Sequence, residues 1–322
     1  MPFEELPPVP SADDLVDRAF SRAARTGRAK HGVEAQRAML DVAGNVLSDN
    51  LEHVVRSWPD FGGLHPYHRA IADVVADIEE LRSHLASIDW AAGQVEAIAA
   101  EHRGRLRGDS DGARRQRKQA FARMADVLEE VADDLATLED ARHELARLPG
   151  IDPEIPTIVV AGYPNVGKSS FLDAVTRARP TLASYPFTTT AVGVGHAEVH
   201  HITYQIVDTP GLLDRPAAER NDIERQALAA LEHLADAIVV LVDPSETCGY
   251  PLEDQLALRD ELVDRFARVG VPVLTVANKA DLSRDVVADY HMSVTEGEGV
   301  DAVLLASVEA VDYEPALPPR RD

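Results

Sequence analysis

One octapeptide restricts the fold of this 322-residue chain more than any other feature. Residues 162–169, with the sequence GYPNVGKS, match the pattern G-x-x-x-x-G-K-[ST] and lie between an apolar, strand-like stretch at 157–161 and a helix-forming stretch. Glycines let a backbone wrap closely around a phosphate, and successive N–H groups at a helix N-terminus supply positive potential. The pattern predicts a phosphate-binding loop. The alternative is an ordinary strand-to-helix turn that contains glycine.

The residue types in this loop predict separate roles. Lys168 is expected to reach the β- and γ-phosphates of a nucleotide, and the Ser169 hydroxyl is expected to bind Mg²⁺. The residues that we expect to contact the nucleotide here are Gly162, Tyr163, Pro164, Asn165, Val166, Gly167, Lys168, Ser169 and Ser170.

A second motif, DTPG at 208–211, ends another apolar stretch. Asp208 can hold Mg²⁺ through water, and the N–H of Gly211 can meet the γ-phosphate. In the run YPFTTT at 185–190, one threonine is expected to bind Mg²⁺ as part of a switch segment. Thr189 is the first candidate and Thr188 is its rival, while a run of threonines that simply favours a strand is the ordinary interpretation.

A third motif, NKAD at 278–281, predicts which base is bound. The Asp281 carboxylate can accept hydrogen bonds from guanine N1–H and the N2 amino group, whereas adenine would leave it unpaired, at a cost of roughly 10⁴-fold in affinity. An exposed Asn-Lys loop is the ordinary interpretation. A further base-contacting loop is expected at 293–294, and the alternative, at 306–307, lies in an expected helix. The base-contacting candidates are Asn278, Lys279, Asp281, Ser293 and Val294, with Ala306 and Ser307 as the alternative.

The residue after DTPG is Leu212, where Ras-like enzymes carry the glutamine that orients the attacking water. Hydrolysis must therefore be assisted by another group. Asn165 could hold a monovalent cation, K⁺, against the phosphates. The catalytic candidates are Lys168, Thr189, Gly211 and Asn165.

The chain changes character near residue 150. Before it, apolar residues fall at helical spacing and predict helices that begin at Ser11, span 33–58, run from about 68 past 88, and span 113–147. After it, strands are expected at 157–161, 191–199, 203–208, 237–243 and 271–277, with helices at 219–234 and 252–268. The expected fold is an all-α antiparallel helical bundle, residues 1–155, followed by an α/β P-loop GTPase domain, residues 156–322, with a mostly parallel, doubly wound sheet.

Acidic residues outnumber basic ones 55 to 32, which gives a formal charge of −23. Only four of the basic residues are lysines, which indicates adaptation to a cytoplasm with molar salt; an acidic protein of a GC-rich genome is the alternative. Because molar salt screens electrostatic repulsion, the negative net charge does not exclude binding to RNA. No contact with DNA is expected. Cys248 is the only cysteine, the N-terminal sequence is unlike a secretory signal, and no apolar run approaches 18 residues. A cytoplasmic protein with no membrane contact is expected.

One basic cluster stands out from this acidic chain. Residues 103–123 hold eight basic side chains against two acidic ones, at a turn between two expected helices. Arginine and lysine at such a tip favour contact with RNA phosphates, whereas a solvated face paired with neighbouring carboxylates is the alternative. The RNA-binding candidates are Arg103, Arg105, Arg107, Arg114, Arg115, Arg117 and Lys118.

These motifs resemble the Nog-type branch of the Obg-like GTPases, the nucleolar GTP-binding protein family, in its short archaeal form. The resemblance covers residues 5–311. It includes RRQRKQAFARM, ARLPGIDP before GYPNVGKSSF, and YPFTTT before VGH, and it is most specific in DTPGLLDRPAAERNDIE and DPSETCGYPLEDQ. The long C-terminal extension of eukaryotic members has no counterpart here, so its roles are not transferred.

The resemblance implies a slow, Mg²⁺-dependent GTPase that binds large-subunit ribosomal RNA and the pre-ribosomal particle, and that acts as a switch in subunit assembly. The alternative function is a helical-bundle GTPase that serves as a protein scaffold or signalling switch without RNA contact.

Overall fold

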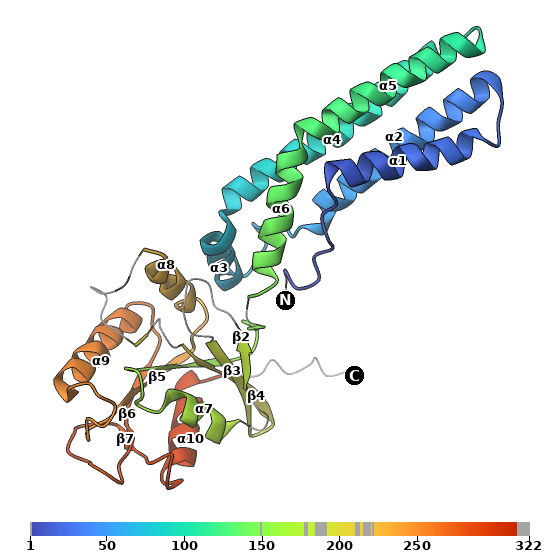
Figure 1. The fold of residues 1–322 in the computed structure, drawn as a ribbon. Coiled ribbons are helices and arrows are strands. Elements are labelled where there is room, and N and C mark those ends of the chain that lie inside the picture. The colour runs from blue at the N-terminus through green and yellow to red at the C-terminus, as the bar shows by residue number, and fades with distance from the viewer. Residues whose placement is uncertain are drawn as a thin grey trace, which may run out of the picture. The chain divides into compact units, whose positions relative to one another are not determined.

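The computed structural model describes most of the chain, in two compact units that differ in secondary structure (Figure 1). One unit is formed by residues 2–64 and 75–146, and the other by 65–74 and 147–322. The predicted boundary at 155/156 divides the chain by sequence pattern, whereas these units follow the packing. The described residues are 2–148, 150–176, 180–183, 192–209, 213–214, 220 and 222–313.

The first unit is an antiparallel helical bundle, in agreement with the predicted all-α region (Figure 1). Ser11 begins its first helix by accepting a hydrogen bond from the Asp14 N–H, 3.2 Å away. The helices are α1 Ala12–Gly27, α2 Gly32–Ser57, α4 Ile78–Arg105, α5 Ser110–Glu130 and α6 Ala132–Leu145. Large side chains that are fully buried in this unit include Phe3, Leu15, Leu40, Leu47, Leu51, Leu81 and Ile88.

Two helices predicted to be continuous are interrupted. The third predicted helix breaks at Asp77, which has a positive φ of 32° and whose side chain caps α4 by accepting from the backbone N–H groups of Glu79 and Glu80. The last one breaks at Val131, between α5 and α6. Both breaks lie within an unbroken three-and-four spacing of apolar residues, so periodicity alone predicted single helices.

The segment before the first break, α3 Pro66–Ala76, packs with the second unit although the chain places it between two bundle helices. Tyr67 and Ile71 are buried in the same apolar core as Ile151 and the sheet. The buried His68 ring lies 3.3 Å from the carbonyl oxygen of Ile151. This helix is therefore a component of the α/β unit.

The α/β unit contains a sheet in the order β2-β3-β4-β1-β5-β6-β7. Strands β4, β1, β5, β6 and β7 are parallel, whereas β3 pairs antiparallel with both β2 and β4. The strands are β1 Thr157–Ala161, β2 Thr181–Ala183, β3 Val192–Val199, β4 Ile202–Asp208, β5 Ala237–Val242, β6 Val273–Ala277 and β7 Tyr290–His291. The helices are α7 Lys168–Val175, α8 Asp222–Leu231, α9 Leu252–Ala267 and α10 Val300–Val311.

This topology confirms the predicted mostly parallel sheet. The strands expected at 191–199 and 203–208 form the antiparallel hairpin β3–β4, while β2 was not predicted. Every residue of β1 and of β5 is buried, which explains why both strands are apolar apart from Thr157. Because parallel strands end at the same edge, the loops after β1, β4, β5 and β6 meet there, where ligands of open α/β sheets bind.

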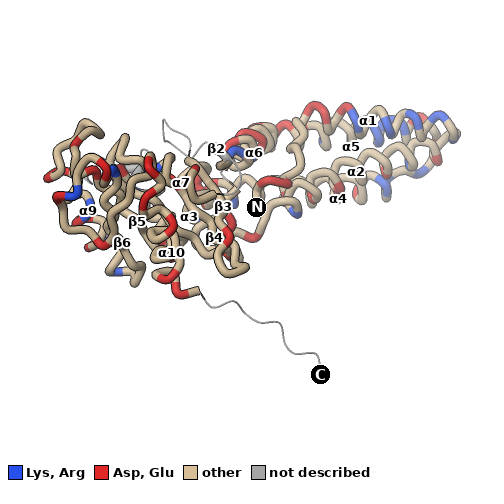
Figure 2. Tube along the Cα trace, turned by 90° about the horizontal axis from the view of Figure 1, so that it is seen from below, with Lys and Arg blue, Asp and Glu red and all other residues tan. Residues whose placement is uncertain are grey.

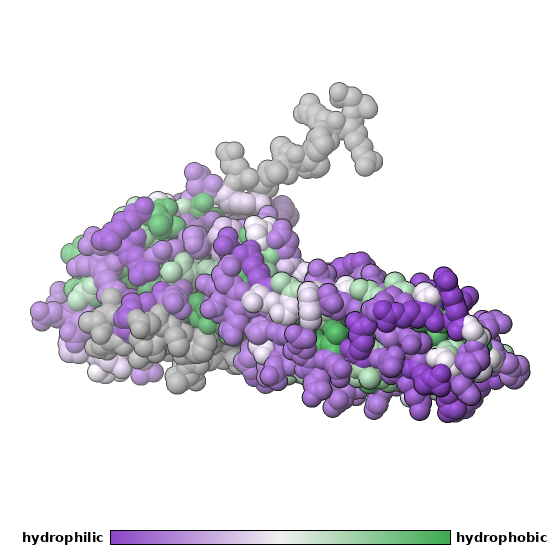
Figure 3. All heavy atoms as spheres, turned by 90° about the horizontal axis from the view of Figure 1, so that it is seen from above, coloured by the Kyte–Doolittle hydropathy of each residue, from purple (hydrophilic) through white to green (hydrophobic). Residues whose placement is uncertain are grey.

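The visible face of the helical bundle is mostly hydrophilic (Figure 3). Among the described residues, no helix combines the length and the apolar character that crossing a bilayer requires.

Candidate functional site

The loop between β1 and α7 needs glycine at both of its ends. Gly162 has φ 130° and Gly167 has φ 108°, which other residues rarely adopt. A Cβ on Gly162 would collide with the backbone carbonyl of Leu241, and a Cβ on Gly167 would collide with the side chain of Asn278. The two glycines let the loop approach β5 and the NKAD segment closely.

Lys168 begins α7 and is almost entirely buried, with 7% of its surface exposed. Its Nζ donates to the carbonyl oxygens of Gly162, at 2.7 Å, and Tyr163, at 3.0 Å. Burial lowers the pKa of the Lys168 amino group, and the carboxylates of Asp208 and Asp214 oppose this shift. A buried cation at the N-terminus of α7 makes this position favourable for an anion.

Asp208, at the end of β4, lies beside the first turn of α7. Its Oδ2 accepts a hydrogen bond of 2.6 Å from the Ser169 hydroxyl. Its Oδ1 is buried and has no hydrogen-bond partner among the described residues. Burial raises the pKa of the Asp208 carboxyl, because the anion is removed from water. A hydroxyl and a carboxylate oxygen without a donor fit a hydrated divalent cation such as Mg²⁺.

Asn278 connects three segments of the predicted site. Its Nδ2 donates to the Val166 carbonyl oxygen at 2.8 Å, and its Oδ1 accepts from the Val294 N–H at 3.2 Å. Ser293, beside Val294, is fully buried and precedes α10, and its Oγ accepts from the Glu296 N–H at 3.2 Å. The loop after β1, the NKAD segment and the 293–294 loop are therefore adjacent, whereas Ser307 of the alternative lies buried within α10.

The loop after β5, residues 243–250, joins the site through Asp243, a residue that sequence reasoning missed. Asp243 Oδ2 accepts from Lys279 Nζ at 2.7 Å, from Thr247 Oγ1 at 3.0 Å and from the Cys248 N–H at 2.8 Å. Its Oδ1 accepts from the Ser245 N–H at 2.9 Å. Burial raises the pKa of the Asp243 carboxyl, but the hydrogen bonds from Lys279 and the loop outweigh it and lower the pKa to about 2.

The same loop packs against the loop after β1. Asn165 Nδ2 lies 3.4 Å from the Cys248 carbonyl oxygen, and the rings of Tyr163 and Tyr250 have centroids 4.7 Å apart. Asn165 adopts a positive φ of 63°, which asparagine tolerates better than most residues. The signal for Asp243 in the sequence is the polar run DPSET directly after an apolar strand, the same placement that Asp208 has at the end of β4.

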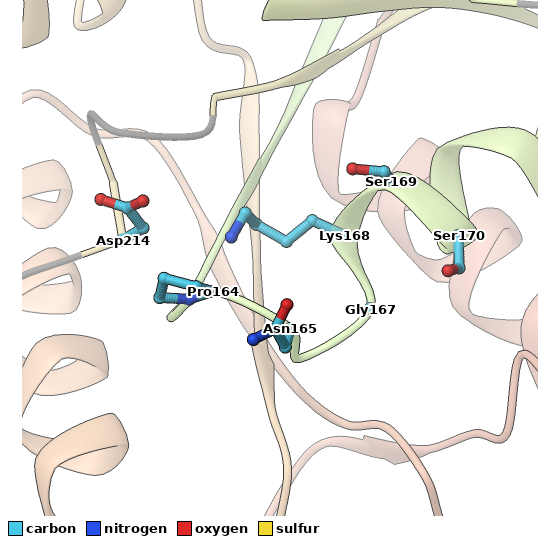
Figure 4. Close-up of a pocket in the computed structure, with 7 residues that line it drawn as sticks. All are labelled: Pro164, Asn165, Gly167, Lys168, Ser169, Ser170 and Asp214. Atoms are coloured by element: carbon cyan, nitrogen blue, oxygen red, sulfur yellow. The ribbon is translucent and has the colours of Figure 1, made fainter. Parts of the chain in front are cut away.

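A cavity of about 520 Å³ opens over this loop (Figure 4). Lys168 lies between Asp214 and the serines, with its ammonium on the side of Asp214 (Figure 4). The cavity is lined by Pro164, Asn165, Gly167, Lys168, Ser169, Ser170 and Asp214. Asp281 is exposed, in the segment after β6. Four predicted residues, Thr188, Thr189, Gly211 and Leu212, lie outside the described residues.

The basic cluster of the bundle divides into two groups. Arg103 pairs with Asp41 at 2.6 Å, and Arg105 pairs with Glu101 at 2.7 Å. Arg117 donates to Gln36 at 2.8 Å and lies over the Phe121 ring, 4.9 Å from its centroid. The exposed members, which form no ion pair in the described part of the chain, are Arg107, Arg114, Arg115 and Lys118.

A strand, a glycine-ended loop and a helix that starts with Lys168 and Ser169, beside Asp208 on the neighbouring strand, define a P-loop fold. Family models agree: the NOG1 N-terminal helical domain matches residues 3–152, and nucleolar GTP-binding protein 1 (NOG1) matches residues 222–281. The chain belongs to the nucleolar GTP-binding protein 1 family, a Nog-type P-loop GTPase family.

Relatives span the chain almost completely. Nucleolar GTP-binding protein 1 of Saccharomyces cerevisiae is 34% identical over 93% of this chain and 48% of its own length. That of Drosophila melanogaster is 33% identical over 95% of this chain and 49% of its own length. The chain thus spans about half the length of these relatives, but 81% of an uncharacterized protein of Methanocaldococcus jannaschii that is 34% identical. A crystal structure of a Plasmodium falciparum nucleolar GTP-binding protein 1 is 32% identical, with a TM-score of 0.45 over 51% of this chain and 90% of that one.

Proposed function

We propose that this chain binds GTP and GDP, hydrolyses GTP slowly with Mg²⁺, and acts in the cytoplasm as a switch in large ribosomal subunit assembly. The observation that carries the proposal is the pair of hydrogen bonds by which Asn278 joins the loop after β1 to the 293–294 loop. These contacts support one pocket in which a phosphate cradle and a guanine-selective carboxylate, Asp281, serve the same ligand. In this proposal residues 156–322 bind the nucleotide and residues 1–155 bind RNA.

Base selectivity is tested by competition for a fluorescent GDP. We expect GTP and GDP to compete and ATP to fail, because adenine cannot satisfy Asp281. Asp281→Asn is the diagnostic variant: an amide can pair with the N1–H and the C2 oxygen of xanthine, so preference should move from guanosine to xanthosine nucleotides. Lys168→Ala should weaken GTP binding about 100-fold. Equal competition by ATP would identify an ATPase instead.

Mg²⁺ is held in this proposal by Ser169 and, through water, by Asp208, with Thr189 completing the set when GTP is bound. The Oδ1 of Asp208, which has no hydrogen-bond partner in the described part of the chain, supports this assignment. The ion would neutralise charge on the β- and γ-phosphates. EDTA should abolish hydrolysis, and Ser169→Ala should raise the Mg²⁺ concentration required for half-maximal rate.

The switch itself is assigned to residues 185–190 and 211–221, which GTP and Mg²⁺ would order through Thr189 and the N–H of Gly211. Asn165, through its Oδ1, is the candidate for holding K⁺ against the phosphates. Its amide nitrogen already points at the Cys248 carbonyl, which supports this orientation of the side chain. Replacing K⁺ with Na⁺ should slow single-turnover hydrolysis, and Asn165→Ala should remove the difference.

RNA contact is assigned to the bundle end that carries the α4–α5 turn. Lysines and arginines gather at this end of the bundle (Figure 2). The α1–α2 turn lies at the same end (Figure 1) and adds Arg25, Arg28 and Lys30, which sequence reasoning did not include. The strongest phosphate-binding candidates are Arg107, Arg114, Arg115 and Lys118, because no described residue neutralises their charges through an ion pair.

Charge reversal at these residues separates the two functions. Arg107→Glu, Arg114→Glu and Arg115→Glu together should abolish co-sedimentation with large subunits. The slope of the logarithm of the RNA-binding constant against the logarithm of the salt concentration should become shallower by about 3. Reversing Arg18, Arg56 and Arg268, three exposed arginines elsewhere, makes the same charge change and should leave both values intact. Persistent co-sedimentation of the first variant would favour a protein scaffold or signalling switch. Equal co-sedimentation of the GDP and GTP-analogue forms would contradict the switch.

A further inference from the structure

The wall of the cavity opposite the two serines is formed by a residue for which neither the motifs nor the family matches supply a role. Asp214 lines the cavity together with Lys168 and Asn165 (Figure 4). It lies three residues beyond Gly211 in the chain, in the segment after the DTPG motif.

The backbone holds Asp214 at this place. Leu213, its neighbour, is fully buried, and its carbonyl oxygen accepts a hydrogen bond of 2.9 Å from the Gly162 N–H. The Leu213 N–H also donates to the Thr209 carbonyl oxygen at 3.4 Å. These two hydrogen bonds place the backbone immediately before Asp214 beside the first residue of the phosphate loop.

A carboxylate at this position supplies a polar group that can orient a water molecule, which the residue after DTPG does not provide. Leu212, which follows DTPG, has no polar atom in its side chain and cannot orient a water molecule. A carboxylate accepts hydrogen bonds from water through two oxygens and can take up a proton. Lys168 lies in the same cavity, so a water held by Asp214 would lie on the side of the cavity where the lysine binds the terminal phosphates.

We propose that Asp214 orients the attacking water of GTP hydrolysis and accepts its proton; this inference rests on the proposed function. The water oxygen forms a bond to the γ-phosphorus, and the bond from that phosphorus to the β–γ bridging oxygen breaks. The bridging oxygen keeps the electron pair and leaves as GDP. One proton of the water passes to the Asp214 carboxylate and then to solvent, and inorganic phosphate is released.

The experiment measures single-turnover hydrolysis and nucleotide affinity on the full chain. Asp214→Ala and Asp214→Asn should lower the hydrolysis rate about 100-fold, the usual contribution of a positioned acid or base. Affinity for a non-hydrolysable GTP analogue should be unchanged or higher, because a negative charge near the phosphates is removed. Asp214→Glu should recover part of the rate, since it keeps the carboxylate. Asp173→Asn, at an exposed position on α7, is the matched control and should keep the full rate.

Each result assigns a cause. If wild type hydrolyses GTP and Asp214→Ala does so at the same rate, Asp214 is not the water-orienting residue and the inference is overturned. If Asp214→Ala lowers rate and affinity together, or Asp214→Glu recovers nothing while thermal stability falls, the residue has a structural role and the inference also fails. A wild-type protein that binds but never hydrolyses GTP would instead overturn the proposed function.

Discussion

Lys168 and Lys279 are two of only four lysines in the chain, and each ammonium group is held by protein oxygens. Lys168 lies against two carbonyl oxygens of its own loop, whereas Lys279 pairs with the carboxylate of Asp243. Both positions suit a compact cation with three donors, whereas 28 arginines supply most of the other basic side chains. The contacts of these two lysines connect each of them to the loop that follows a strand of the sheet.

The pKa of Asp243 makes a prediction about pH. Its folded value, about 2, lies below the ordinary 3.8, so its ion pair stabilises the fold fully above pH 4 and loses this effect as the pH falls toward 2. Asp243→Asn should cost about 2 kcal/mol of unfolding free energy at pH 7. The difference from wild type, measured by urea unfolding, should shrink below pH 4. A difference that is constant from pH 7 to pH 3 would contradict the assignment.

Asp243 should also affect binding, because it positions Lys279. The Asn variant is expected to weaken GTP and GDP equally, while GTP remains preferred over ATP because Asp281 is untouched. Thr247→Val removes a hydroxyl that contacts both Lys279 and Asp243, and it should give a smaller effect in the same direction. Isothermal titration with GDP, GTP and ATP measures the nucleotide affinities of wild type and of the two variants. Loss of base preference would show that Asp243 acts on the base itself.

Residue motifs with fixed spacing could be predicted from the sequence, because each is local. The loop at 162–169, Asp208 and the NKAD segment lie at the ends of strands that the apolar pattern also indicated. Asp214 and Asp243 were missed because their placement depends on residues far along the chain: Gly162 for the segment before Asp214, and Lys279 for Asp243.

At the scale of elements, a capping residue overrides helical periodicity. Apolar residues continue at helical spacing from Ile71 through Ile88, yet Asp77 ends one helix and begins the next. Its side chain accepts from two N–H groups that would otherwise lack partners, at 3.0 and 3.2 Å, and this offsets the cost of a positive φ. Because the chain contains many aspartates, the sequence alone does not show that this one ends a helix and caps the next.

The cap predicts a graded mutational series. Asp77→Ala should destabilise the protein by about 1–2 kcal/mol, because it loses the cap and retains an unfavourable backbone conformation. Asp77→Asn should be close to neutral, since asparagine caps helices and tolerates positive φ. Chemical denaturation of the two variants gives the comparison. Equal losses for Ala and Asn would mean that the charge of Asp77, and not its cap, is what matters.

At the scale of the whole molecule, sequence order and packing disagree at α3. The chain crosses between the two units at residues 64–65, 74–75 and 146–147. The sequence indicated a helical region and an α/β region correctly, but a helix inserted between two bundle helices gave no sign that Tyr67 and Ile71 would complete the core of the sheet. The placement of α3 in the α/β unit depends on contacts between residues far apart in the sequence, and the spacing of apolar residues gives no information about such contacts.

Net charge is also a property of the whole molecule, and it predicts how stability depends on salt. The formal charge of −23 means that acidic side chains repel one another across the protein surface. The distance over which this repulsion acts is about 10 Å at 0.1 M salt and less than about 3 Å above 1 M. Raising KCl from 0.1 to 3 M should therefore increase Tm by about 10 °C, measured by circular dichroism without nucleotide. NaCl should give the same increase, because screening does not distinguish the cations, and this separates the effect from K⁺ held at Asn165. A Tm that is flat or falls over this range would mean that the scarcity of lysine reflects genome composition and not adaptation to salt.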